Sequence, residues 1–381
     1  MRLRTRSARP AAVLPLLAAA ALAGCTDVPA EPAAAAGEDD GTVAVRAADD
    51  ACEVSRTDLT SGITTFAITN EGSDVTEVYV YAPGDRIVTE KENIGPGTSY
   101  ELTVDLTEGP YQVACKPGMV GDGVRQDVRV AGTTAPPDPA AEEAVRTYRA
   151  WVQEQADLSV APVQQLRDAV AAGDAERARA LYAPSRVPWE SIEPVAESFG
   201  DLDPRMDARE ADLAEGEVFS GWHRLEKALW TGEDLAPLVP VADQLVLDVQ
   251  ELAQRVPNAA LTPTSIGNGA KELLDEVATG KITGEEEAFS HTDLVDFDAN
   301  VAGAARALDA LRPLVSQSDP ELVATLDAEF ADVRAALEPY RTADGFVPYD
   351  TVGEEQRREL ARVVDALSEP LSRLGAAAGR A

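Results

Sequence analysis

The sequence has few histidines, few cysteines and a shortage of positive charge. Its 381 residues include two histidines and three cysteines, and 33 lysines and arginines stand against 67 aspartates and glutamates. The formal net charge is −34 at pH 7. So acidic a surface repels phosphate backbones, which argues against nucleic acid as a partner. Carboxylates attract cations without selecting among them, so the charge alone does not indicate a metal site.

Long apolar runs are also scarce. The run from Ala11 to Gly24 has 14 residues, fewer than the roughly 20 that a membrane-spanning helix needs. Four arginines precede it and Leu22-Ala-Gly-Cys25 ends it, an order typical of a lipoprotein signal peptide. We expect residues 1–24 to be removed, which would leave a net charge of −38, because they hold these four arginines and no acid.

The lipid anchor is expected on Cys25, which would hold an exported protein at the outer face of the cell membrane. The alternative is an ordinary secreted protein cut nearby, periplasmic if the anchor is absent. Residues 25–41 are rich in alanine, proline and acids, so we expect a flexible tether.

Residues 42–131 show short runs with alternating apolar and polar residues. Examples are Ile63–Thr69, Thr76–Tyr81 and Tyr100–Leu106, separated by glycine, asparagine, aspartate and proline. This pattern predicts a small antiparallel β-sandwich. Residues 132–139 contain three prolines and are expected to form a stiff linker between domains.

Residues 140–381 have helical periodicity and are expected to form an all-α bundle domain, long enough for two packed bundles with separate cores. Asp319 before Pro320 is typical of a capped helix start, and Thr351 with Glu354 has the spacing of a capping box. The expected helices cover about 140–157, 160–172, 187–199, 217–230, 235–255, 267–280, 293–316, 320–341 and 354–374.

Two pairs of metal-ligand residues occur at helical spacing in this region. His223 and Glu226 are three residues apart, as are Glu190 and Glu193, so each pair would share one helix face. Bundle proteins hold iron with carboxylates and Glu-x-x-His pairs that project inward, and such ligands suit a hard or borderline cation. A single pair with this spacing is more often a solvated helix face.

Several stretches together resemble the imelysin-like domain of EfeO-type iron uptake proteins. They are Trp189–Pro204, Asp207–Glu210, Gly221–Glu226 and Gly284–Leu294, and the match covers most of residues 140–381. Imelysins carry Gly-x-His-x-x-Glu, which stands here as Gly221, His223 and Glu226. The resemblance implies an ion site made from Glu190, Glu193, Asp207, His223, Glu226 and an acid near Glu286.

The last of these ligands is chosen from three consecutive glutamates, residues 285–287. Only some of them can face inward on a helix, and we select Glu286. His291 and Asp293 are either additional ligands or residues that support the ligands or cap a helix.

The first domain has its own candidate ligands. Cys115-Lys-Pro-Gly-Met119 follows a strand, as the ligand loop of blue-copper proteins does, but the domain has no histidine, which disfavours a type 1 copper site. This region also resembles the cupredoxin-like domain of the same family, which implies an accessory copper or iron site. The candidates are Cys52, Cys115, Met119 and Glu77; the alternative is a Cys52–Cys115 disulfide, which an oxidising compartment favours.

The resemblance as a whole implies an iron-binding transport component and favours this over an enzyme. The protein would capture ferrous or ferric iron and deliver it to an EfeU-like permease, with an EfeB-like haem peroxidase as a further partner. The same ligands also accept zinc or copper. The alternatives are a metal-dependent peptidase of imelysin type and a copper-assisted ferroxidase. The sequence has no His-Glu-x-x-His motif, which disfavours hydrolysis.

Overall fold

The computed structural model describes residues 42–133, 138–213 and 216–380. The expected signal peptide, the Cys25 anchor and the tether therefore lie outside the described residues, as do positions 134–137 of the expected linker. None of the helices formed by the described residues has the length and apolar character needed to cross a membrane.

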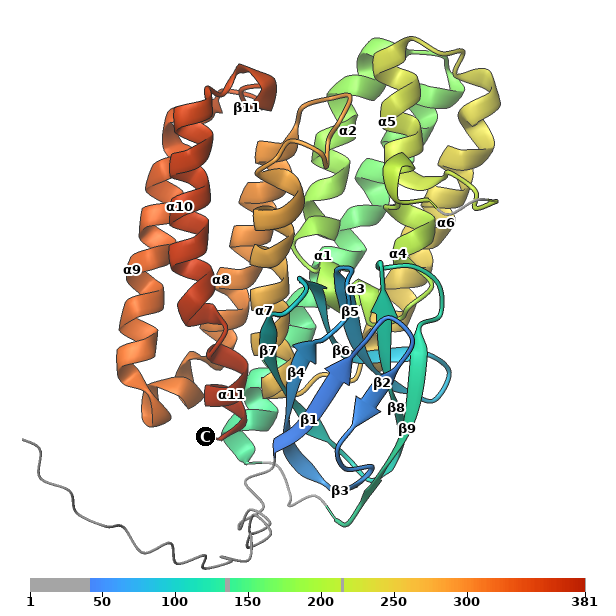
Figure 1. Cartoon of the computed structure of the whole chain (residues 1–381). Coiled ribbons are helices and arrows are strands. Elements are labelled where there is room, and N and C mark those ends of the chain that lie inside the picture. The colour runs from blue at the N-terminus through green and yellow to red at the C-terminus, as the bar shows by residue number, and fades with distance from the viewer. Residues whose placement is uncertain (1–41, 134–137, 214–215, 381) are drawn as a thin grey trace, which may run out of the picture. The chain divides into compact units, whose positions relative to one another are not determined.

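The first domain is a sandwich of two mixed sheets, drawn in blue and blue-green in Figure 1. In the described part of the chain, one sheet has the order β2-β1-β4-β7 and the other the order β3-β9-β8-β5-β6. The strands are β1 (Thr42–Ala47), β2 (Cys52–Val54), β3 (Asp58–Thr60), β4 (Gly62–Asn70), β5 (Thr76–Ala82), β6 (Arg86–Ile94), β7 (Ser99–Leu106), β8 (Gly109–Pro117) and β9 (Val124–Ala131).

The pairing of these strands is only partly antiparallel. β1 runs parallel to β4, and β3 runs parallel to β9. The sequence prediction was wrong for these two pairs, because residue alternation shows which face of a strand is buried and not the direction of its neighbour. The alternation itself is confirmed: Phe66 and Ile68 of β4 point into the apolar core with Val43 and Val45 of β1.

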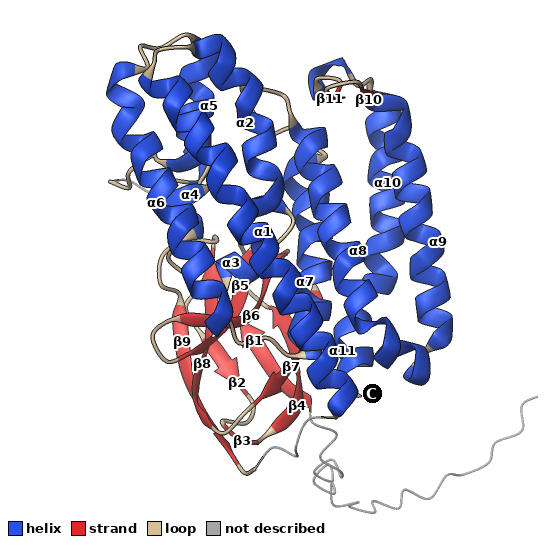
Figure 2. Cartoon of the chain, turned by 180° about the vertical axis from the view of Figure 1, so that it is seen from behind, coloured by secondary structure: helices blue, strands red, loops and turns tan. Residues whose placement is uncertain are grey.

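The second domain is helical, as expected (Figure 2). α1 packs against α2, α6 and α8, and α8 packs against α7 and α9. A single apolar core runs from Ala144 of α1 to Ala378 of α11, although the region is long enough for two bundles with separate cores. The helices are α1 (Pro139–Ala171), α2 (Ala175–Glu190), α3 (Glu193–Glu197), α4 (Asp203–Met206), α5 (Gly221–Thr231), α6 (Val239–Arg255), α7 (Pro263–Glu276), α8 (Asp293–Ser318), α9 (Pro320–Leu337), α10 (Glu354–Leu371) and α11 (Leu374–Gly379).

Helix boundaries follow the predicted signals in some places only. Asp319 caps α9, since its side chain accepts a hydrogen bond from the Leu322 amide at 2.9 Å. The prediction of a capping box at Thr351 was wrong, because the N-cap of α10 is Gly353 and no side chain caps this helix by a hydrogen bond. α1 continues through Pro162, so two expected helices are one.

The helical region also contains structure that periodicity did not predict. A short hairpin, β10 (Arg341–Thr342) and β11 (Gly345–Phe346), separates α9 from α10. The last turn after α7 widens into a π-helical turn, η4 (Val277–Lys281). π-turns are rare and often occur at functional sites.

Candidate metal centre

His223 lies at the start of α5 with both ring nitrogens facing carboxylates. The residue is 2% exposed, and its Nδ1 lies 3.3 Å from Oε2 of Glu226. Nε2 lies 3.4 Å from Oδ1 of Asp207 and 3.6 Å from Oε1 of Glu286. Nε2 has no hydrogen-bond partner among the described residues, although it is buried. The charges of the two carboxylates compensate for this, and a cation between the three side chains would give all of them a direct ligand bond.

The position of His223 depends on a glycine. Gly221, the first residue of α5, has φ +71°, and a Cβ there would lie 1.9 Å from the carbonyl oxygen of Met206, at the end of α4. The absence of a side chain thus lets α5 begin directly against α4. Asp207 follows Met206 immediately, so this close approach brings Asp207 to His223.

Glu190, Glu193 and Asp207 form a second group whose carboxylate oxygens lie within 4.8 Å of one another. α2 ends at Glu190 and α3 begins at Glu193, so the two glutamates do not share one continuous helix, but they still converge. We call this group the carboxylate subsite, and we call Asp207, His223 and Glu286 the histidine subsite. Asp207 belongs to both.

The segment between η4 and α8 carries Glu286 and Glu287. Both are buried, at 6% and 0% exposure, whereas Glu285 is exposed. As expected, only some of the three glutamates face inward. The segment is a series of turns and not a helix, which lets two neighbouring glutamates both be buried. Glu287 accepts hydrogen bonds from the hydroxyls of Tyr182 at 3.1 Å and Ser290 at 2.5 Å.

Glu226 connects α5 to this same segment. Its Oε1 accepts hydrogen bonds from the backbone amides of Phe289 at 2.9 Å and Ser290 at 2.7 Å, while Oε2 faces His223. Glu226, His223 and Glu287 form a third group of potential ligands. Because N–H and O–H donors already contact the carboxylates of this group, its geometry suits orientation of the imidazole better than direct coordination.

Two fully buried cations in the centre were not predicted from the sequence. Arg186 on α2 forms ion pairs with Glu190 and Asp207, with Glu287 at 2.8 Å and with Asp296 at 3.1 Å. Nζ of Lys281 lies 3.2 Å from Glu190 and 3.8 Å from both Glu193 and Glu286.

The sequence contains a signal for one of these two cations and none for the other. Arg186 stands four residues before Glu190, a spacing that would have placed it beside this ligand. Lys281 ends a π-turn, where ordinary helical spacing no longer applies, so periodicity gave no signal for it.

The buried acids of the centre outnumber its cations. Burial raises the pKa of Glu287 to about 7 and raises the pKa values of Glu193 and Asp296 well above their usual range, despite the opposing charges of Lys281 and Arg186. Uncompensated buried charge is expensive, so some of these carboxyls hold protons when no further cation is present. Among the described residues the acids are Glu190, Glu193, Asp207, Glu226, Glu286, Glu287 and Asp296, against Arg186, Lys281 and the protonated form of His223.

Asp207, Glu286 and His223 are ionised by their mutual contacts. Burial opposes ionisation of Asp207 and Glu286, but Arg186 and His223 lower the pKa of Asp207, and Lys281 and His223 hold that of Glu286 well below its usual range. Burial and Arg186 disfavour protonation of His223, yet contacts with Glu226, Glu286 and Asp207 raise its pKa to about 10. In the ion-free protein at neutral pH, the imidazole is therefore protonated, and a metal ion must replace that proton.

Comparison with known proteins places this arrangement in a family. Residues 144–374 match the Imelysin family model, and residues 14–124 match the model of a cupredoxin-like domain. The chain is 38% identical to the iron uptake system component EfeO of Escherichia coli O157:H7 over 379 residues, which are 97% of this chain and 96% of the relative. The chain belongs to the EfeO family. The EfeO proteins of E. coli K12 and Shigella flexneri are each 37% identical with the same coverage.

Asp293 and His291, the two remaining candidates of the helical domain, hydrogen-bond to backbone amides in this EfeO-family chain. Oδ1 of Asp293 accepts a hydrogen bond from the amide of Glu287 at 3.2 Å, and burial raises the pKa of Asp293 to about 6. His291 has φ +58°, and its carbonyl accepts a hydrogen bond from the amide of Tyr349 at 2.8 Å. Within the described residues, His291 belongs to no group of potential metal ligands.

The candidate metal ligands in the sandwich of the EfeO-family chain do not lie together in one site. Cys52 and Cys115 form a disulfide, with Cα atoms 5.5 Å apart, between β2 and β8. Glu77 pairs across strands with Lys116, so it lies on the sheet face opposite to Cys115, whose side chain is in the core. Met119 is 38% exposed in the loop after β8. The disulfide alternative is thus the one that the structure contains, and it removes both thiolates as ligands.

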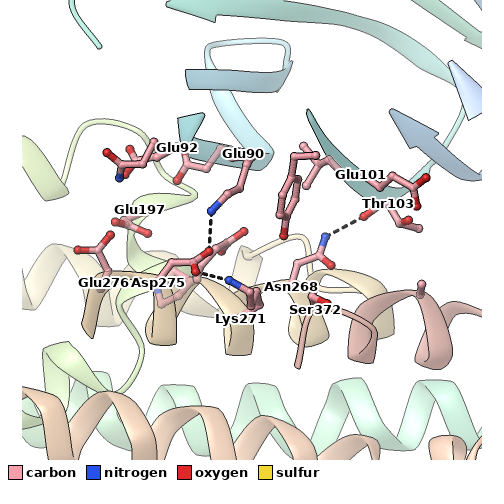
Figure 3. Close-up of a pocket in the computed structure, with 17 residues that line it drawn as sticks. Glu90, Glu92, Glu101, Thr103, Glu197, Asn268, Lys271, Asp275, Glu276 and Ser372 are labelled. Carbon is pink, nitrogen blue, oxygen red and sulfur yellow. Dashed lines mark hydrogen bonds and ion pairs between the residues drawn. The ribbon is translucent and has the colours of Figure 1, made fainter. Parts of the chain in front are cut away.

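Residues of both the sandwich and the helical domain line an acidic pocket (Figure 3). Nζ of Lys91 on β6 donates to Asp275 on α7 at 2.7 Å, and Asn268 donates to the carbonyl of Thr103 on β7 at 2.8 Å. Burial raises the pKa of Glu276, which lines this pocket, to about 8. The further acids that line it are Glu90, Glu92, Glu101, Glu197, Glu272 and Asp275.

Proposed function

We propose that this EfeO-family chain is a lipid-anchored, extracytoplasmic iron-binding component that captures iron at its buried centre and delivers it to a membrane permease. The observation that carries the proposal is the buried Nε2 of His223, which has no hydrogen-bond partner in the described part of the chain and lies between Asp207 and Glu286. One imidazole with carboxylates is a ligand set that suits iron. Iron is here the cargo, so no covalent chemistry is needed.

The geometry assigns separate tasks to the residues around the ion. His223 and the carboxylates of Asp207 and Glu286 would contact it. Glu226 would orient the imidazole through Nδ1, which leaves Nε2 for the ion. Nε1 of Trp189 donates to Oδ2 of Asp207 at 2.7 Å, which fixes the carboxylate while Oδ1 faces His223.

The location and partners in this proposal rest on sequence. The order of arginines, apolar run and Cys25 supports export and anchoring at the outer face of the membrane. The relatives are named iron uptake system components, which supports membership of such a system; an EfeU-like permease and an EfeB-like haem peroxidase are the partners we propose.

The alternatives require ligands that the described residues do not bring together. A zinc peptidase commonly uses two histidines with a further ligand and a base, but among the described residues His223 is the one histidine that belongs to the centre. A copper-assisted ferroxidase would need soft ligands in the sandwich, where Cys52 and Cys115 are bonded to each other. Both points support a binding role over catalysis.

The test is anaerobic calorimetric titration of the mature chain with ferrous ion, alongside ferric, zinc and copper ions in separate runs. His223→Asn should weaken iron binding by more than about tenfold, since a direct ligand matters at least as much as its supporting residues. His291→Asn is the matched control, because asparagine tolerates the left-handed backbone at that position and the side chain is outside the centre. Equal affinity in wild type and His223→Asn would overturn the proposal.

A further inference from the structure

Glu197 belongs both to the acidic pocket of Figure 3 and to a group of carboxylates beside the buried centre. It is the last residue of α3, and it lines the pocket together with Glu92 of β6 and Glu276 of α7. Its carboxylate also lies with those of Glu193 and Asp203, with one oxygen of each within 4.8 Å of the others. Because Glu193 is a member of the carboxylate subsite, Glu197 connects the pocket to the centre.

From Glu197 inward, three groups of potential ligands overlap. The outermost, with Glu193, Glu197 and Asp203, shares Glu193 with the carboxylate subsite. The carboxylate subsite in turn shares Asp207 with the histidine subsite. Burial increases along this line, since Glu197 is partly exposed, Glu193 is 5% exposed and His223 is 2% exposed. A cation that moves along it keeps a shared carboxylate at each step, so it never has to lose all its ligands at once.

The charges in the pocket are strongly unbalanced. Seven acids and two lysines are among the residues that line it, and both lysines, Lys91 and Lys271, pair with the same acid, Asp275. In the described part of the chain, six acids thus line the pocket without an ion pair to these lysines. Burial raises the pKa values of two of them, Glu272 and Glu276, to about 8. An arriving cation favours their ionised forms, so the pocket attracts it more strongly as it enters.

We propose that this acidic pocket is the entrance through which iron reaches the histidine subsite, and that Glu197 passes the ion from the pocket to the buried carboxylates. The inference rests on the proposed function, because the ion that enters is the one bound at His223. The carboxylates in between are stages on its path. A cleft lined by charges of one sign concentrates ions of the opposite sign and can raise association rates by about 10–1000-fold.

Two buried oxygens beside this path lack a hydrogen-bond donor among the described residues. One is Oε2 of Glu90, which lines the pocket. The other is Oδ1 of Asn300 on α8, a fully buried residue whose Nδ2 donates to Oε2 of Glu193 at 3.3 Å. A buried oxygen without a donor is costly, and carboxylate and amide oxygens are good ligands for hard cations. A passing ion would give both oxygens a partner.

Arg209 opposes a direct approach to the histidine subsite. Its side chain is 32% exposed; Nη1 lies 3.2 Å from Oε2 of Glu286, and Nε donates to Asp212 at 2.6 Å. A positive charge fixed beside Glu286 repels a cation that comes from solvent at this point. Arg209 is not among the residues that line the pocket, so an ion that enters past Glu197 avoids the guanidinium.

The test measures the rate of iron loading separately from the affinity. Wild type and Glu197→Met are mixed anaerobically with ferrous ion in a stopped-flow instrument at pH 8. Tryptophan fluorescence follows the arrival of the ion, because Nε1 of Trp189 donates to Asp207. We expect Glu197→Met to load and to release iron more than about tenfold more slowly than wild type, since it lacks the carboxylate that joins the pocket to the centre. Affinity by calorimetry should stay within about threefold, because Glu197 does not contact the bound ion.

A second variant, Glu92→Gln, acts at the outer end of the path and has a matched control. It removes one charge from the pocket and should slow loading by about threefold at low ionic strength, with a smaller difference in high salt. Glu355→Gln removes the same charge from an exposed position on α10, outside the pocket, and should load like wild type. Since Glu92 is partly exposed and glutamine can still accept the hydrogen bond from Tyr79, this variant decides the question if Glu197→Met does not fold.

The outcomes separate the inference from the proposed function. Weakened affinity in His223→Asn, with unchanged loading rates in Glu197→Met and Glu92→Gln, would retain the iron site and reject the pocket as its entrance. Unchanged rates in the two pocket variants with faster loading in Arg209→Gln would place the entrance at Arg209 instead. Equal affinity of wild type and His223→Asn would reject the iron site itself, and the entrance with it.

Discussion

His223 and Glu226 face each other one helical turn apart on α5, with Nδ1 and Oε2 separated by 3.3 Å. The other oxygen of Glu226 binds the backbone amides of Phe289 and Ser290, in the segment that also carries Glu286. A single carboxylate therefore orients the imidazole and attaches the segment that supplies an opposing ligand. The His-x-x-Glu spacing thus does more than place two potential ligands on one helix face: it also puts Glu226 where it can fix the segment that follows η4.

Glu226→Gln tests this double role. The amide can still contact His223, but the charge-assisted hydrogen bonds to the two backbone amides become weaker. We expect iron affinity to fall by about 10–100-fold and the free energy of unfolding to fall by about 1–3 kcal/mol, measured by calorimetry and urea denaturation. Glu233→Gln, an exposed acid just after α5, is the control and should change iron affinity little. Indistinguishable effects of the two changes would contradict the assignment.

Gly221→Ala should separate the steric clash from the cost of an unfavourable backbone angle. A Cβ at Gly221 would approach the Met206 carbonyl oxygen to 1.9 Å, whereas at Gly232, with a similar φ of +75°, nothing lies within 4 Å. Gly232→Ala should therefore cost only about 1 kcal/mol of unfolding free energy, and Gly221→Ala more than about 3 kcal/mol. Equilibrium denaturation of both variants measures the difference. Equal costs would mean that α4 moves away without penalty.

The sequence predicted the candidate ligands but not the buried cations that surround them. Glu190, Glu193, Asp207, His223, Glu226 and Glu286 could be named because short motifs resemble a family, and the structure brings them together. Glu190 and Glu193 illustrate the limit, since i,i+3 spacing assumed one helix whereas the chain breaks between them. Their convergence depends on tertiary packing, which local spacing does not encode.

Other features depended on contacts between distant segments. Arg186 reaches acids as far along the chain as Asp296, and Lys281 reaches Glu190 from a π-turn. The parallel pairing of β1 with β4 is equally invisible to residue alternation. By contrast, the Asp319 cap was predictable, because it depends on a side chain and an amide three residues apart.

The ion-free protein should lose stability as the pH rises from about 5 to 9. Burial raises the pKa of Glu287 from 4.5 to about 7 and that of Asp293 from 3.8 to about 6, so the folded state binds more protons than the unfolded state in this range. A raised pKa contributes stability that is complete below the unfolded value and is lost as the pH passes the folded value. The pKa of His223 is raised from 6.5 to about 10, so this group also contributes stability that is lost as the pH rises between these two values.

Urea denaturation at several pH values checks this expectation. Glu287→Gln should reduce the decline between pH 5 and 8, since the amide does not titrate, and saturating manganese should offset it by neutralising the ionised acids. A free energy of unfolding that rises over this range would show that the buried acids are ionised throughout.

The disulfide should support the sandwich without taking part in iron binding at the helical centre. Cys52 and Cys115 are 63 residues apart, and closing a loop of this length typically adds about 2–4 kcal/mol of stability. We expect the Cys52→Ala/Cys115→Ala double variant, or the reduced wild type, to unfold at a lower temperature. Its affinity for ferrous ion should stay within about twofold of wild type, because the centre draws its groups from α2, α3, α5, η4 and α8 and the segments beside them. Thermal unfolding and calorimetry on the same samples measure both quantities. Iron binding that disappears with the disulfide, while the helices remain folded by circular dichroism, would place the principal iron site in the sandwich instead.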